Sequence, residues 1–126
     1  MSGMWEQDYI MRLIGDMIKF IAKVFLGKSQ ISYKISYEDE HSHTDLLHKQ
    51  LLELIELGKI NEAENLLFEE MDTNNMEYLE LALDFYQRLS KLNDDFLERN
   101  NFSREEIIEG LKDLAKEFGL EKLPFS

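Results

Sequence analysis

The chain contains no cysteine and only one proline among its 126 residues. Without cysteine it cannot form a disulfide, a thiolate zinc site or a cysteine nucleophile, and the lack of thiols fits a reducing compartment. Glu6 and Asp8 stand before the first apolar stretch, where a secretory signal would carry positive charge. We therefore expect a cytoplasmic protein.

The common signatures of enzymes are also missing. The sequence has no glycine-rich phosphate loop, no Gly-x-Ser-x-Gly elbow, no His-Glu-x-x-His motif and no Asp-x-Asp-x-Asp-Gly calcium loop. The interpretation leans away from an enzyme, and no cofactor is expected.

The charge is strongly acidic and unevenly distributed. The net charge is −12, of which residues 1–37 contribute +2 and residues 38–126 contribute −14. Such a surface repels nucleic-acid phosphates and anionic lipid headgroups, so no nucleic-acid partner is expected and a membrane partner is unlikely. An apolar content of 44% in 126 residues predicts one core, hence a single domain over residues 1–126.

Residues 5–27 form the most distinctive stretch, a predicted amphipathic helix. Its polar side chains fall on one side, which leaves an apolar surface wider than one neighbouring helix covers. Charges recur too often along it for a transmembrane span. Three hypotheses stay open: a central core helix wrapped by the others, a helix shared with a second copy in a homodimer, or attachment to a membrane surface.

Residues 28–43 are predicted as an extended linker, and residues 44–119 as helical. Ile31, Tyr33, Ile35 and Tyr37 alternate with polar residues, which is the period of a strand, although a plain linker, a strand paired across a dimer axis or a helix start also fit. We then expect a helix from Thr44 to Gly58, another from Asn61 with Glu64 in a capping box, and a long helix over 76–100. A last helix has a Ser103–Glu106 capping box and ends at Gly119. The predicted fold is all-α, an irregular bundle of about five helices.

The segment LLELIELGKINEAENLLFEEM resembles the helix-turn-helix of a tetratricopeptide repeat. Its turn, from Gly58 to Ala63, carries the glycine and alanine that such turns favour. The match covers one repeat, so we predict a tetratricopeptide-like hairpin and no repeat array.

Gln7, Asp8, Tyr9, Ile10, Arg12 and Ile14, followed by the stretch from Leu51 to Glu70, carry a wider resemblance. The chain is similar to a family of short uncharacterised bacterial proteins, found mainly in Gram-positive species. The resemblance implies a helical fold and a cytosolic bacterial origin, and it implies no chemistry.

Two groups of residues are candidate sites. Trp5, Tyr9 and Arg12 are predicted contact residues, because interfaces favour an arginine beside aromatic rings, although Trp5 and Tyr9 also suit the core. His41, His43 and His48 lie beside several carboxylates and could bind a divalent metal. Their spacing matches no established zinc motif, so a solvated loop leading to a helix cap at Thr44 is the competing interpretation.

The functional hypothesis is a protein-interaction or assembly module that acts through a helical groove or a homodimer face. The partner would be another protein or a second copy of the chain. The alternative hypothesis is a small-molecule or metal-binding pocket with enzyme-like activity, lined by Tyr78, Tyr86 and the histidines.

Overall fold

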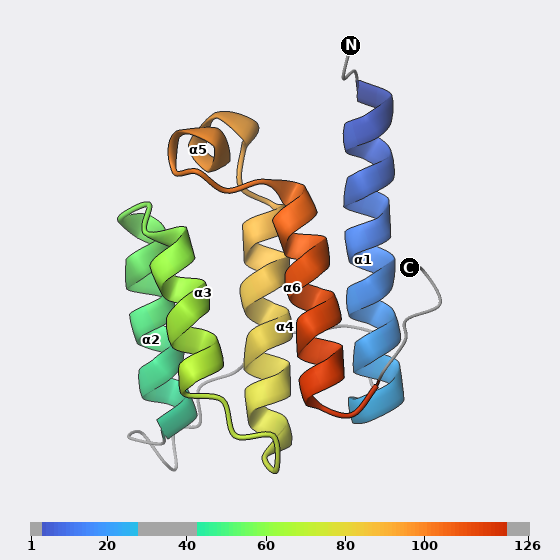
Figure 1. Ribbon diagram of the computed structural model, residues 1–126, viewed down its shortest axis with the longest axis vertical. Helices are drawn as coiled ribbons and strands as arrows, with labels where there is room; N and C mark the ends of the chain where they lie inside the picture. The colour runs from blue at the N-terminus through green and yellow to red at the C-terminus, as the bar shows by residue number, and fades with distance from the viewer. Residues whose placement is uncertain (1–3, 28–42, 121–126) are drawn as a thin grey trace.

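The computed structural model describes residues 4–27 and 43–120, with the side chains of the first helix described from Asp8 onward. These ranges contain six helices and no strand, which confirms the all-α prediction (Figure 1). The predicted extended segment at 31–37 lies outside them. The helices are α1 (Met4–Leu26), α2 (His43–Glu56), α3 (Ile60–Glu69), α4 (Met76–Ser90), α5 (Asp94–Arg99) and α6 (Arg104–Glu117).

The central helix of the bundle is α4. It packs against α1, α6 and α2, while α3 packs on α2 (Figure 1). Most of its residues are buried, as expected for a core helix: Tyr78, Leu79, Leu81, Ala82, Leu83, Asp84, Phe85, Tyr86, Leu89 and Ser90. The hypothesis that the first helix is central is therefore wrong, because α1 lies at the edge of the bundle and packs mainly on α4 and α6.

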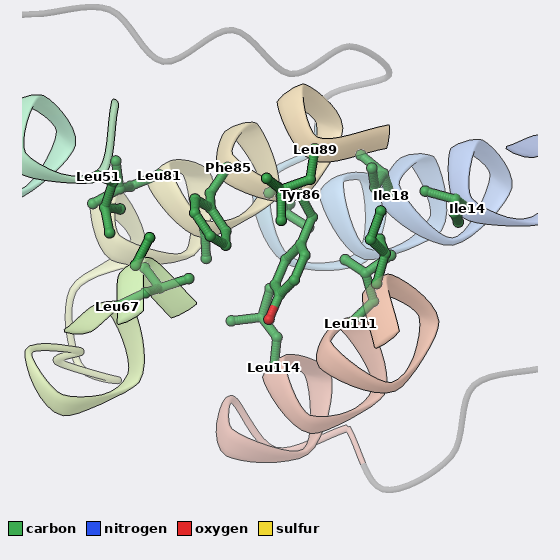
Figure 2. Packing of buried hydrophobic residues seen from close by; sticks show 14 of the residues in the cluster. Ile14, Ile18, Leu51, Leu67, Leu81, Phe85, Tyr86, Leu89, Leu111 and Leu114 are labelled. Atoms are coloured by element: carbon green, nitrogen blue, oxygen red, sulfur yellow. The ribbon is translucent and has the colours of Figure 1, made fainter. Parts of the chain in front are cut away.

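Apolar side chains on both sides of α4 form one core. Figure 2 shows Leu51 and Leu67, from α2 and α3, on one side of α4, and Ile14, Ile18 and Leu111, from α1 and α6, on the other. None of the helices in the described ranges combines the length and the apolar character that crossing a bilayer requires.

The predicted ends of α6 are confirmed. The Ser103 hydroxyl accepts a hydrogen bond from the Glu106 amide at 3.3 Å, and the Glu106 carboxylate accepts one from the Ser103 amide at 2.7 Å. Beyond the helix, Gly119 has φ +102° and the Leu120 amide donates to the Ala115 carbonyl at 2.8 Å. This is the hydrogen bond of a Schellman stop, so glycine is required there by the backbone.

The predicted long helix over 76–100 is wrong, because the chain breaks into α4 and α5. The amides of Lys91 and Leu92 bond to carbonyls three residues back, which tightens the last turn of α4. Asn93 then caps α5 by accepting a hydrogen bond from the Phe96 amide at 2.8 Å. The apolar periodicity continues through the turn, but the asparagine stops the helix.

Two predicted caps are also wrong. The capping residue of α3 is Lys59, without a side-chain cap, whereas Asn61 lies inside the helix and its amide donates to the Asn101 carbonyl at 3.2 Å. Thr44 lies in the first turn of α2, and its hydroxyl donates to the Glu77 carboxylate on α4 at 3.0 Å. In both cases the polar side chain binds a distant segment.

Candidate functional site

The N-terminal part of α1 carries apolar side chains that the described chain leaves uncovered. Tyr9 is 67% exposed and Met11 is 41% exposed. Met11 lies two helical turns before Ile18 on the same face of the helix, yet Ile18 is only 5% exposed. The core-facing stripe therefore continues beyond the part of the bundle that covers it.

The arrangement of the helices explains this difference. Figure 1 shows α1 extending past the ends of α4 and α6 at its N-terminal side. Complete burial on α1 begins at Ile14 and continues through Met17 and Ile21, whereas Ile10 is half-buried. We name Asp8, Tyr9, Ile10, Met11 and Arg12 the N-terminal surface of α1.

The predicted contact residues can be placed on this surface. Tyr9 and Arg12 are both exposed, so their side chains are available to a partner. Trp5 lies in the first turns of α1, but its side chain is outside the described part. Asp8 and Arg12 form no ion pair within the described residues.

A second cluster of polar residues lies between α2 and α4. His48 and Asp84 are each only 6% exposed, and His48 Nε2 lies 3.2 Å from Asp84 Oδ2. Arg88, at the edge of the bundle, donates a hydrogen bond of 2.7 Å from Nε to the same oxygen. Burial favours the neutral carboxyl, but the hydrogen bonds from His48 and Arg88 outweigh it and lower the pKa of Asp84.

The predicted metal residues do not share one set of contacts. His43 contacts the Tyr78 hydroxyl through Nδ1, and its Nε2 lies 3.7 Å from a Glu70 oxygen, whereas His48 binds Asp84. His41 is outside the described residues. Within the described ranges no group of three or more histidine or carboxylate side chains could hold a metal ion. Metal binding by the three histidines stays a prediction.

A third feature is an acidic groove of about 400 Å³ between α3 and α6. It is lined by Glu64, Asn65, Phe68, Glu106, Glu109, Gly110, Asp113, Lys116 and Glu117. The groove does not contain the tyrosines and histidines that the pocket hypothesis assigned.

Beneath the groove, Tyr86 reaches from α4 toward α6 (Figure 2) and donates a 2.5 Å hydrogen bond to the Glu64 carboxylate. A side chain on Gly110 would collide with this pair, since a Cβ there would lie 2.5 Å from Tyr86 Cζ and 2.7 Å from Glu64 Oε2. The absence of a side chain at Gly110 lets Tyr86 cross to α3.

The charged form of the Glu64 carboxyl is unfavourable in the folded protein. Burial raises its pKa, the Tyr86 hydrogen bond partly offsets this, and the negative charges of Glu106 and Asp113 raise it further. Burial together with the Glu64 charge also raises the pKa of the Tyr86 hydroxyl.

Sequence reasoning missed two of these interactions. Asp84 and Arg88 have the i, i+4 spacing of a helical ion pair, which could have identified them. The Glu64–Tyr86 contact joins residues 22 positions apart on different helices, and no local signal indicates it.

No curated protein and no solved structure matches the chain. A family model does match, over residues 4–119, and its description is a family of unknown function, DUF6483. The matched range includes all six described helices and both stretches that carry the resemblance, residues 7–14 and 51–70. The chain therefore belongs to the DUF6483 family.

Proposed function

We propose that this protein is a non-enzymatic assembly module that binds a second copy of itself through the N-terminal surface of α1. The observation that carries the proposal is the exposure of Met11, 41%, against 5% for Ile18 on the same helix face. The core-facing stripe is thus partly open at its N-terminal end, where in this proposal a second copy covers it.

The distribution of charge favours α1 as the place where two copies would meet. Two molecules with a net charge of −12 repel each other, and the acidic residues lie mainly after residue 37. In α1 the described charged side chains are Arg12, Lys19 and Lys23 against Asp8 and Asp16. Contact through α1 therefore brings together the least repulsive parts of the two surfaces.

The size of the surface predicts a modest affinity. Burying a large apolar side chain contributes about 1.5–3 kcal/mol, and only a few are available here. Association costs several kcal/mol in lost translational and rotational freedom. We therefore expect self-association that depends on protein concentration.

Three further parts of the proposal have separate support. The absence of cysteine supports a cytoplasmic location. The residues shared with the resembling family support a bacterial origin. The Gly58 turn between α2 and α3, at φ +79°, supports the tetratricopeptide-like character of that hairpin.

The test compares two substitutions on the same helix. Met11→Glu places a charge on the proposed surface, whereas Val24→Glu places the same charge on a residue that is 51% exposed in the last turn of α1. We expect light scattering to show loss of the dimer for Met11→Glu only, with unchanged helicity by circular dichroism in both variants. Equal masses for both variants at every concentration would contradict the proposal.

A further inference from the structure

We propose that the two copies pack their α1 helices antiparallel around a two-fold axis, so that Asp8 of each copy faces Arg12 of the other. This inference rests on the proposed function and specifies the geometry of the same surface. It assigns a role to two charged residues that no contact within the described chain explains.

Asp8 and Arg12 lie on one flank of α1. Asp8 and Arg12 are four residues apart, so they lie on the same flank of α1 and about 6 Å apart along its axis. Both are exposed, and neither forms an ion pair in the described ranges. Among the described residues, neither charge therefore has an ion-pair partner.

The two-fold symmetry of the dimer determines which side chains meet. In an antiparallel pair, side chains on the same flank of the two helices meet. A two-fold axis level with Ile10 then places Asp8 opposite Arg12 twice, once on each side of the axis. In a parallel pair opposite flanks meet, so Asp8 and Arg12 of one copy would not face Arg12 and Asp8 of the other. The antiparallel arrangement also opposes the two helix dipoles.

Met11 provides the apolar contact between the two copies. Met11 is one residue from the level of the axis, so the Met11 side chains of the two copies lie close together. Their 41% exposure is then covered by the same contact that pairs the charges. Methionine suits such a symmetric contact because its thioether is flexible and polarisable.

Charge reversal tests this geometry. Asp8→Arg and Arg12→Asp each replace two attractive pairs by two repulsive ones, and we expect either change to raise the dimer dissociation constant about tenfold. The double substitution Asp8→Arg with Arg12→Asp restores both pairs and should return the constant to within about twofold of the original.

A mixture of the two single variants provides a control for effects on folding. One copy then carries arginine at both positions and the other carries aspartate at both, so a mixed dimer should form more tightly than either variant alone. Sedimentation equilibrium of the separate and mixed variants measures this, with circular dichroism as the folding check.

The outcomes separate the two proposals. If Met11→Glu dissociates the dimer but both single reversals leave the constant unchanged, the antiparallel pairing is overturned and the proposed function stands. If reversals weaken the dimer and neither the double variant nor the mixture recovers it, the pairing of Asp8 with Arg12 is also overturned. If Met11→Glu and Val24→Glu behave alike, the proposed function itself fails.

Discussion

Glu64 is a carboxyl group whose ionisation works against the fold. Its pKa is raised in the folded protein, first by burial and then by Glu106 and Asp113. A raised carboxyl pKa contributes stability that is fully present below the unfolded value of about 4.5 and is lost as pH rises through the folded value.

Replacing Glu64 by glutamine should therefore stabilise the protein at neutral pH. Glutamine stays uncharged and can still accept the hydrogen bond from Tyr86. We expect urea unfolding to show a higher free energy of unfolding for Glu64→Gln at pH 7 and little difference near pH 4. Glu62→Gln, at an exposed position of the same helix, is the control and should show no such pH dependence. A constant difference across this pH range would refute the assignment.

Gly110 and Gly15 form a matched pair of helical glycines. Alanine normally stabilises a helix interior by about 0.5–1 kcal/mol relative to glycine. At Gly15 a Cβ would meet nothing within 4 Å, so Gly15→Ala should give this gain. At Gly110 it would collide with Tyr86 and Glu64, so Gly110→Ala should destabilise by about 1–3 kcal/mol. Thermal unfolding of dilute samples measures both, and equal shifts would show that Tyr86 does not need the space at Gly110.

At the scale of helices, α2 is attached to α4 by polar as well as apolar contacts. The Thr44 hydroxyl donates a hydrogen bond to Glu77. The buried His48 forms a hydrogen bond with Asp84, and Arg88 donates one to the same carboxylate. Because the pKa of Asp84 is lowered in the folded state, its charged form contributes stability above the unfolded value of about 3.8. That contribution is lost as pH falls through the folded value.

Asp84→Asn should consequently cost about 1–3 kcal/mol at pH 7, since the polar partners remain but the charge is gone. The cost should shrink as the pH falls through the unfolded value of about 3.8 toward the lower folded value, because the unfolded chain takes up its proton first. Chemical unfolding over this pH range measures it, with the exposed Asp16→Asn as control. A cost that stays the same at pH 3 would argue against a lowered pKa.

The accuracy of sequence reasoning at this scale depended on whether the signal was local. The Ser103–Glu106 capping box and the Gly119 stop involve neighbouring residues, and both were predicted correctly. The break at Asn93 was missed because Leu89, Leu92 and Phe96 continue the apolar pattern across it. Asn61 and Thr44 were misassigned because their side chains bind Asn101 and Glu77, which lie more than 30 residues away.

The candidate sites likewise combine features set by one helix with features set by contacts between distant residues. Amphipathicity is encoded within one helix, and both Tyr9 and Arg12 are exposed, but their contact role stays a prediction. That α4 and not α1 is central depends on how six helices pack, and periodicity alone does not determine this. The Glu64–Tyr86 pair and its need for Gly110 are likewise products of packing.

At the scale of the whole molecule, the bundle fully buries side chains of α1 only from Ile14 onward, covers Ile10 in part and leaves Tyr9 and Met11 exposed. The more acidic part of the chain supplies α4 and α6, which pack against α1, whose own charge is more balanced. In our proposal these two properties together direct copies of the chain to meet through α1.

The most direct test is sedimentation equilibrium of the unmodified protein over a wide range of concentrations. The proposal predicts that the mass rises from 15.0 kDa toward twice that value, and that Met11→Glu abolishes the rise. A mass that stays at 15.0 kDa up to the highest concentration would contradict it.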